Sequence, residues 1–72
     1  METRKDLGWY TSYDAKGYRM NADIQVTYDP VDDFYLLTYE VGRTVQRAQD
    51  IIISDDGRRI YHIDGWFLKR ND

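Results

Sequence analysis

Residues 60–69, Ile-Tyr-His-Ile-Asp-Gly-Trp-Phe-Leu-Lys, place an Asp-Gly pair between two runs of strand-forming residues. Asp-Gly favours a two-residue turn of type I′, because both positions accept a positive backbone φ. Such a turn predicts a hairpin in which Ile63 pairs with Trp66 and Tyr61 pairs with Leu68. These four side chains then share an apolar face. The opposite face is mixed and carries Ile60, His62, Phe67 and Lys69.

Turn-forming residues recur between short apolar runs upstream of this hairpin. They lie at 14–17 (Asp-Ala-Lys-Gly), 29–33 (Asp-Pro-Val-Asp-Asp) and 54–57 (Ser-Asp-Asp-Gly). Glycine accepts positive φ and aspartate bonds nearby backbone amides, so each segment favours a chain reversal. The runs between the turns predict short strands, at 9–13, 24–28, 34–41, 51–54 and 58–63.

Alternation within these strands predicts which side chains share a face. In 34–41 one face carries Tyr35, Leu37, Tyr39 and Val41. In 9–13 one face carries Trp9, Thr11 and Tyr13, which leaves Tyr10 and Ser12 pointing outward.

The run of three isoleucines at 51–53 puts apolar side chains on both faces of its strand. That pattern is typical of a strand covered on both sides, in a small barrel or at a dimer seam. Two registers remain open for the hairpin that joins 51–54 to 58–63, because three- and four-residue loops give opposite pairings.

The fold class predicted from these patterns is mainly β, a small antiparallel hairpin meander of five or six strands. Curling into an SH3-like or OB-like barrel would protect the edges of so small a sheet. The alternative is an α+β sheet with one short helix at 43–50, capped by Thr44. Seventy-two residues make a single β-rich domain, 1–72, with 1–6 and 71–72 expected to fray.

Composition narrows the classes of function. The chain has no cysteine and one histidine, so no disulfide, thiolate zinc site or histidine-rich metal site is expected, and no cofactor. No apolar run is long enough for a signal peptide or a membrane span, and we expect a cytoplasmic protein that does not enter membranes. The formal charge of −3 disfavours nucleic acid as a partner. Neither Ser12 nor Ser54 lies in a nucleophile motif that His62 would serve, so no enzyme is predicted.

Seven tyrosines are the most informative excess in the composition, because tyrosine is enriched in protein-binding surfaces. The leading hypothesis is a small acidic protein-binding module that occupies the surface of a larger protein partner, such as its nucleic-acid-binding groove. A stoichiometric inhibitor or adaptor of the kind that phages and mobile elements encode fits this size and charge. A homodimer is a further option. The candidate protein-binding residues are Tyr10, Tyr13, Tyr18, Asp29, Asp32, Asp33, Asp55 and Asp56.

Paired basic residues support an alternative hypothesis. The pairs at 58–59 and 69–70 fall on adjacent strands of the C-terminal hairpin, beside aromatic residues. A basic stripe interleaved with aromatic rings is how small barrels bind single-stranded nucleic acid. The candidate residues for this nucleic-acid-binding barrel are Arg58, Arg59, Phe67, Lys69 and Arg70.

Overall fold

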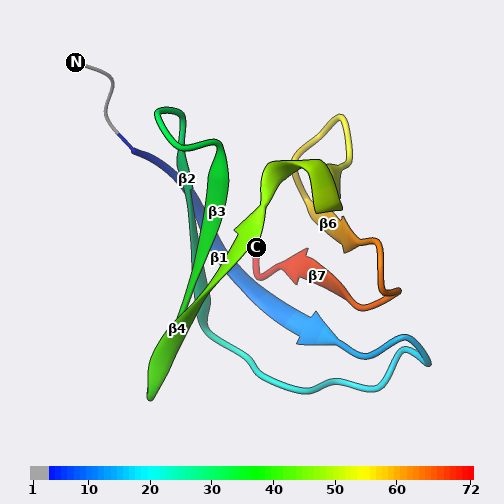
Figure 1. Cartoon of the computed structure of the whole chain (residues 1–72). Helices are drawn as coiled ribbons and strands as arrows, with labels where there is room; N and C mark the ends of the chain where they lie inside the picture. Colours follow the sequence, from blue (N-terminus) through cyan, green and yellow to red (C-terminus); the bar gives the residue numbers. More distant parts are fainter. Residues whose placement is uncertain (1–3) are drawn as a thin grey trace.

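The computed structural model describes residues 4–72, and almost all of its regular structure is strand (Figure 1). Seven strands form one antiparallel sheet in the order β4-β3-β2-β1-β7-β6-β5. Their bounds are β1 (Lys5–Tyr13), β2 (Ile24–Asp29), β3 (Phe34–Tyr39), β4 (Gly42–Arg47), β5 (Ile51–Ile53), β6 (Arg59–His62) and β7 (Phe67–Arg70); a 3₁₀ turn, η1, spans Ala48–Asp50. The mainly β prediction is confirmed, with seven strands rather than five or six.

Strand β1 joins two halves of the sheet. Its residues Lys5–Tyr10 pair with β2, and its residues Tyr10–Tyr13 pair with β7. The register shifts between Asp6 and Gly8, and Gly8 has a φ of +111°, a value that bends the strand at the bulge. Figure 1 shows β1 passing from the group β2–β4 to the group β6–β7. The first and last strands of the chain are therefore neighbours, which a simple hairpin meander does not provide.

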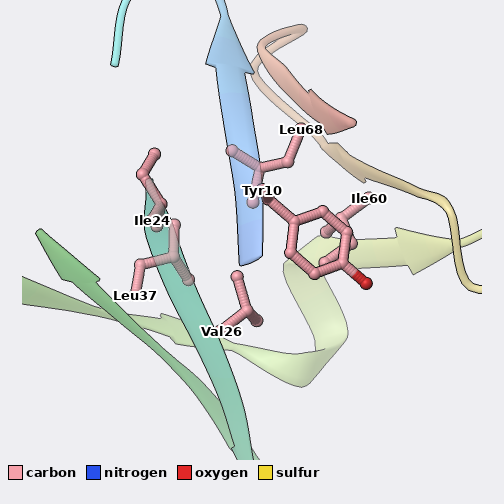
Figure 2. Close-up of a cluster of buried hydrophobic side chains, with 6 residues drawn as sticks. All are labelled: Tyr10, Ile24, Val26, Leu37, Ile60 and Leu68. Atoms are coloured by element: carbon pink, nitrogen blue, oxygen red, sulfur yellow. The ribbon is translucent and has the colours of Figure 1, made fainter. Parts of the chain in front are cut away.

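The core lies between the two halves, on the inner face of the bent sheet (Figure 2). Leu37, Val26 and Ile24 come from one half, and Ile60 and Leu68 come from the other. Tyr10 lies among them on β1, and its hydroxyl donates a hydrogen bond of 2.7 Å to the carbonyl of Gly57. The predicted common face of Tyr35, Leu37 and Tyr39 is confirmed, and it is the inner face, because all three contribute to this core.

The two edges of the sheet, β4 and β5, are separated in sequence only by η1. An extended chain spans about 3.5 Å per residue, so the edges must converge at this connection. The Ala48 amide donates to the Asp33 carbonyl, and the Ile63 amide donates to the Asp50 carbonyl, both at 3.1 Å. Within residues 4–72 no ladder pairs β4 with β5, so the sheet is not closed and the predicted barrel is not confirmed.

The alternative helix at 43–50 is wrong apart from the three residues of η1. Residues 42–47 form β4, which pairs with β3 from Tyr39↔Gly42 to Phe34↔Arg47. No side chain caps η1, so Thr44 is not a helix cap. Eight residues form a marginal helix in isolation, and six ladder positions against β3 outweigh that preference. The reversal at 40–41 leaves Val41 exposed, so it does not share the face of Tyr35, Leu37 and Tyr39 as predicted.

The hairpin at 60–69 forms, but its predicted register is wrong by one residue. Ile60 pairs with Leu68 and Tyr61 pairs with Phe67. The loop has three residues, 63–65, and the Gly65 amide donates to the His62 carbonyl at 2.9 Å. Gly65 has a φ of +102°, which suits the left-handed position that ends a three-residue hairpin loop. The core-facing side is therefore Ile60 and Leu68.

The structure also decides the register left open at 51–63. The Ser54 amide donates to the Arg59 carbonyl at 2.9 Å, which leaves a four-residue loop. Ile51 and Ile53 pack against the core, whereas Ile52 is 68% exposed. Within this chain β5 is therefore covered on one face only, and the dimer seam stays a prediction.

The faces of β1 are the reverse of the prediction. Tyr10 and Ser12 are buried, and Trp9 is 52% exposed. Two of the segments expected to fray, 4–6 and 71–72, lie at β1 in the structure. Residues 5–6 belong to that strand, and the Asn71 amide donates to the Trp9 carbonyl at 2.9 Å. Residues 1–3 of the predicted frayed end lie outside the described residues.

Candidate functional site

Three aromatic side chains form a row across the outer face of the sheet, the face turned away from the core. Tyr13 on β1 pairs with Phe67 on β7, and Phe67 pairs with Tyr61 on β6. The rings of Tyr13 and Phe67 stack with centroids 5.1 Å apart and planes 12° apart, and the ring of Tyr61 lies 6.1 Å from that of Phe67. We call these three residues the aromatic row. Ile52, which pairs with Tyr61, extends it onto β5.

The next row of the same face carries two cations. Lys69 pairs with Arg59 and with Thr11, so both charges lie one pleat away from the aromatic row. The Lys69 ammonium lies 5.2 Å from the centroid of the Tyr13 ring and 5.9 Å from that of Phe67, within the range of a cation–π contact. The Arg59 guanidinium lies 3.5 Å from the Tyr61 hydroxyl, a contact that raises the pKa of the guanidinium.

The register of the C-terminal hairpin creates this surface. In a two-residue turn, Tyr61 would pair with Leu68 and point to the core, and His62 would be the neighbour of Phe67. The three-residue loop moves Tyr61 next to Phe67 on the outer face and places Arg59 beside Lys69. The same shift that buries the aliphatic residues therefore gathers rings and cations on the solvent side.

Charge is divided between the strands and the turns of the described chain. Within the strands the acidic residues are Asp6 and Asp29, and the basic residues are Lys5, Arg43, Arg47, Arg59, Lys69 and Arg70. The other acidic residues from 4 to 72 lie in turns, in connections or at the C-terminus. The negative net charge of the chain therefore does not describe the potential at the outer face of β6 and β7.

Among the residues predicted to bind nucleic acid, Arg59, Phe67 and Lys69 come together on this face. Arg70 alternates to the other face, where its guanidinium forms an ion pair of 3.0 Å with Asp72. Arg58 lies in the turn before β6, where its carbonyl accepts the Arg70 amide at 2.8 Å. Tyr13 and Tyr61 complete the site. The hypothesis had not included them, although Tyr13 was a protein-binding candidate and alternation along the true register would have found Tyr61.

The residues predicted to bind protein do not form one surface. Tyr10 belongs to the core, where it is 1% exposed. Asp29 is almost fully buried, and its carboxylate accepts the Val31 amide at 2.9 Å while pairing with Arg4 at 3.7 Å. Tyr18 is 69% exposed on the β1–β2 connection.

The other acidic candidates lie in two separate turns. Asp32 and Asp33 belong to the β2–β3 turn, where Asp33 accepts the Tyr28 hydroxyl. Asp55 and Asp56 belong to the β5–β6 turn. The Arg58 amide and the Ser54 hydroxyl hold the pKa of Asp56 below its usual value. Asp33 and Asp56 therefore each have a clear structural role in their own turn.

Burial gives Tyr10 a measurable effect on stability at alkaline pH. Burial raises the pKa of the Tyr10 hydroxyl, and the nearby Arg70 offsets part of the rise. A group whose pKa is higher in the folded than in the unfolded state stabilises the fold below its unfolded pKa, about 10 for tyrosine, and this contribution is lost as pH rises through the folded pKa. We expect the free energy of unfolding, from urea titrations, to fall above about pH 10.

The variant Tyr10→Phe should flatten this fall, because it removes the titrating group, and it should lower stability at neutral pH by about 1 kcal/mol through the lost bond to Gly57. Tyr18→Phe is the control, since that ring is exposed. An alkaline fall of the same steepness in the Tyr10→Phe variant would contradict the assignment. The pKa of Tyr35 is also raised, by burial and then by Asp33, so some pH dependence should remain.

Comparison with protein-family models, with curated proteins and with solved structures finds no match to this chain. Within residues 4–72, no group of three or more His, Asp or Glu side chains is placed to hold a metal ion. The same part of the chain contains no helix with the length and apolar character needed to cross a membrane.

Proposed function

We propose that the chain binds single-stranded nucleic acid on the outer face of β1, β7 and β6. The observation that carries the proposal is the aromatic row with Lys69 and Arg59 in register beside it. Of the two sets of candidate residues considered from the sequence, this is the one whose members largely share a face.

The chemistry of the face suits a flexible polyanion with stacking bases. Every base has a π-face, so aromatic side chains bind single strands with little sequence preference. The row crosses three adjacent strands spaced about 4.8 Å apart, and bases would stack on the ring faces that the neighbouring rings do not cover. Lys69 and Arg59 supply positive charge for the phosphates between those bases.

Salt dependence tests the proposal directly. Fluorescence anisotropy would measure the affinity for labelled oligothymidylate and oligouridylate at several salt concentrations. Each phosphate contact contributes about −0.7 to the slope of log affinity against log salt for single strands, so two cations predict a slope of about −1.4. Lys69→Gln should reduce the steepness by about 0.7, and Lys16→Gln, in the β1–β2 turn, should not change it. Undetectable binding at about 20 mM salt would rule the proposal out.

A second proposal is the protein-binding module expected from composition, acting as a stoichiometric inhibitor or adaptor. The exposed aliphatic side chains of Ile52 and Ile63 favour it, because aliphatic groups contribute little to base stacking. In that case Ile52→Glu should abolish a one-to-one complex with a protein partner on size-exclusion chromatography. A complex that survives the substitution would exclude this surface as the protein interface.

A further inference from the structure

A cavity of about 390 Å³ opens at the C-terminal end of β1, where Ser12 and Tyr13 contribute to its lining. It lies between the β1–β2 connection, the β3–β4 hairpin and the turn that joins β6 to β7. Each of these three segments contributes one apolar wall; the wall residues are Met20, Tyr39 and Trp66. The volume falls within the range of pockets that hold small ligands. Tyr13 of the aromatic row also contributes to the lining, whereas Phe67, Arg59 and Lys69 do not.

The Trp66 wall is held by its neighbours. Its ring stacks on the His62 ring with centroids 4.4 Å apart and planes 11° apart. The Nδ1 atom of His62 accepts a hydrogen bond of 3.0 Å from the Asp64 amide. The same Nδ1 atom lies 3.6 Å from the Asp64 carboxylate, so His62 braces both the ring of Trp66 and the turn that carries Asp64.

The β1–β2 connection is held close to the same turn. A side chain added at Gly65 would bring its Cβ within 3.2 Å of the Ala15 Cβ, so the two segments are in close contact. The Asp14 carboxylate accepts the amides of Lys16 and Tyr18, each at 2.9 Å, which fixes the start of the connection. The cavity is therefore bounded by two braced turns rather than by unconstrained loops.

The charge of the lining selects the kind of ligand. Asp14 and Asp64 line the cavity, and among residues 4–72 no lysine, arginine or histidine does. Aromatic rings present a negative face and attract cations, most strongly in the case of tryptophan. An anionic ligand would meet two carboxylates without a counter-charge. Asn21 and Gln46 add amide groups that suit a polar substituent on the ligand.

From this combination we propose that the cavity binds a small organic ammonium ion. The methyl or methylene groups of the ligand contact Met20, Tyr39 and Trp66, and its charge is balanced by Asp14 and Asp64. The two carboxylates by themselves would not select this ligand, and neither would the aromatic walls. Both line the same cavity, and the combination favours an organic cation. Because Asp64 is largely exposed to water, the expected dissociation constant is on the order of 1 mM.

Choline and its neutral isostere 3,3-dimethyl-1-butanol form a matched pair of probes, alike in shape and different in charge. Titration of the full chain would be followed by the NMR signals of the two tryptophan indole N–H groups, at constant chloride concentration. We expect choline to shift the Trp66 signal with saturation and to leave Trp9, which does not line the cavity, almost unchanged. The isostere should bind at least about 10-fold more weakly, since it lacks the charge that the rings attract.

Asp64→Asn should weaken choline binding by about 3- to 10-fold, and Asp55→Asn, in the β5–β6 turn, should leave it unchanged. Both substitutions are in exposed turns, so folding should survive. A Trp66 signal that does not move, equal binding of the two probes, or equal effects of the two substitutions would each overturn the proposal. The oligonucleotide assay tests other groups, because Phe67, Arg59 and Lys69 do not line the cavity.

Discussion

Ile60→Ala should lower the free energy of unfolding by about 2–5 kcal/mol, and Ile63→Ala should change it by less than about 0.5 kcal/mol. The two isoleucines lie three positions apart in one hairpin, but Ile60 is 1% exposed and Ile63 is 66% exposed. Truncating Ile60 leaves a cavity against Leu68, its partner on β7. A domain of this size has a stability of only a few kcal/mol, so much of the Ile60→Ala protein should be unfolded in water.

Urea titrations followed by circular dichroism would measure both variants. Ile60→Val is the milder test, with an expected loss of about 0.5–1.5 kcal/mol, and it keeps the comparison possible if the alanine variant does not fold. If the free energy of unfolding falls more in Ile63→Ala than in Ile60→Ala, the result would support the two-residue turn, because that register buries Ile63 in place of Ile60.

Phe67→Leu should weaken oligonucleotide binding by about 5- to 150-fold, the loss of 1–3 kcal/mol associated with one stacked base. Phe67 is the centre of the aromatic row and contacts both neighbouring rings. Leucine keeps an apolar side chain at a half-buried position and removes only the ring, so the sheet should remain folded. Tyr61→Leu, at one end of the row, should have a smaller effect of the same kind.

Tyr18→Leu is the matched control, because Tyr18 is an exposed tyrosine outside the row. Anisotropy titrations at one low salt concentration would compare the three variants, with circular dichroism as the check on folding. Binding that is unchanged in Phe67→Leu, or reduced equally in Tyr18→Leu, would contradict a site built on the aromatic row.

The candidate site was only partly predictable from the sequence. The proximity of Arg59 and Lys69 was expected, since both lie beside one strong turn signal. The position of Tyr61 in the site was not expected, because it depends on whether the Asp64-Gly65 turn has two or three loop residues. Either loop places Gly65 at positive φ, so local turn chemistry does not separate them. The packing of Ile60 and Leu68 against Tyr10 does.

The sequence by itself determined that the chain forms short antiparallel strands, and it placed most of their turns. These properties are local: aspartate and glycine reverse the chain, and alternating β-branched and aromatic residues favour a pleated strand. Only the tertiary structure decided which faces are buried. Residues 9, 10 and 13 put aromatic rings on both faces of β1, so alternation alone did not choose between them.

That choice was made by long-range pairing. Strand β1 lies between β2 and β7, and the bulge at Gly8 bends it so that Tyr10 points into the space between the two halves. The hairpin at 60–69 then takes the register that presents Ile60 and Leu68 to the same space. The Asp-Gly turn was visible in the residues themselves, but its register followed from which side chains the rest of the sheet could cover.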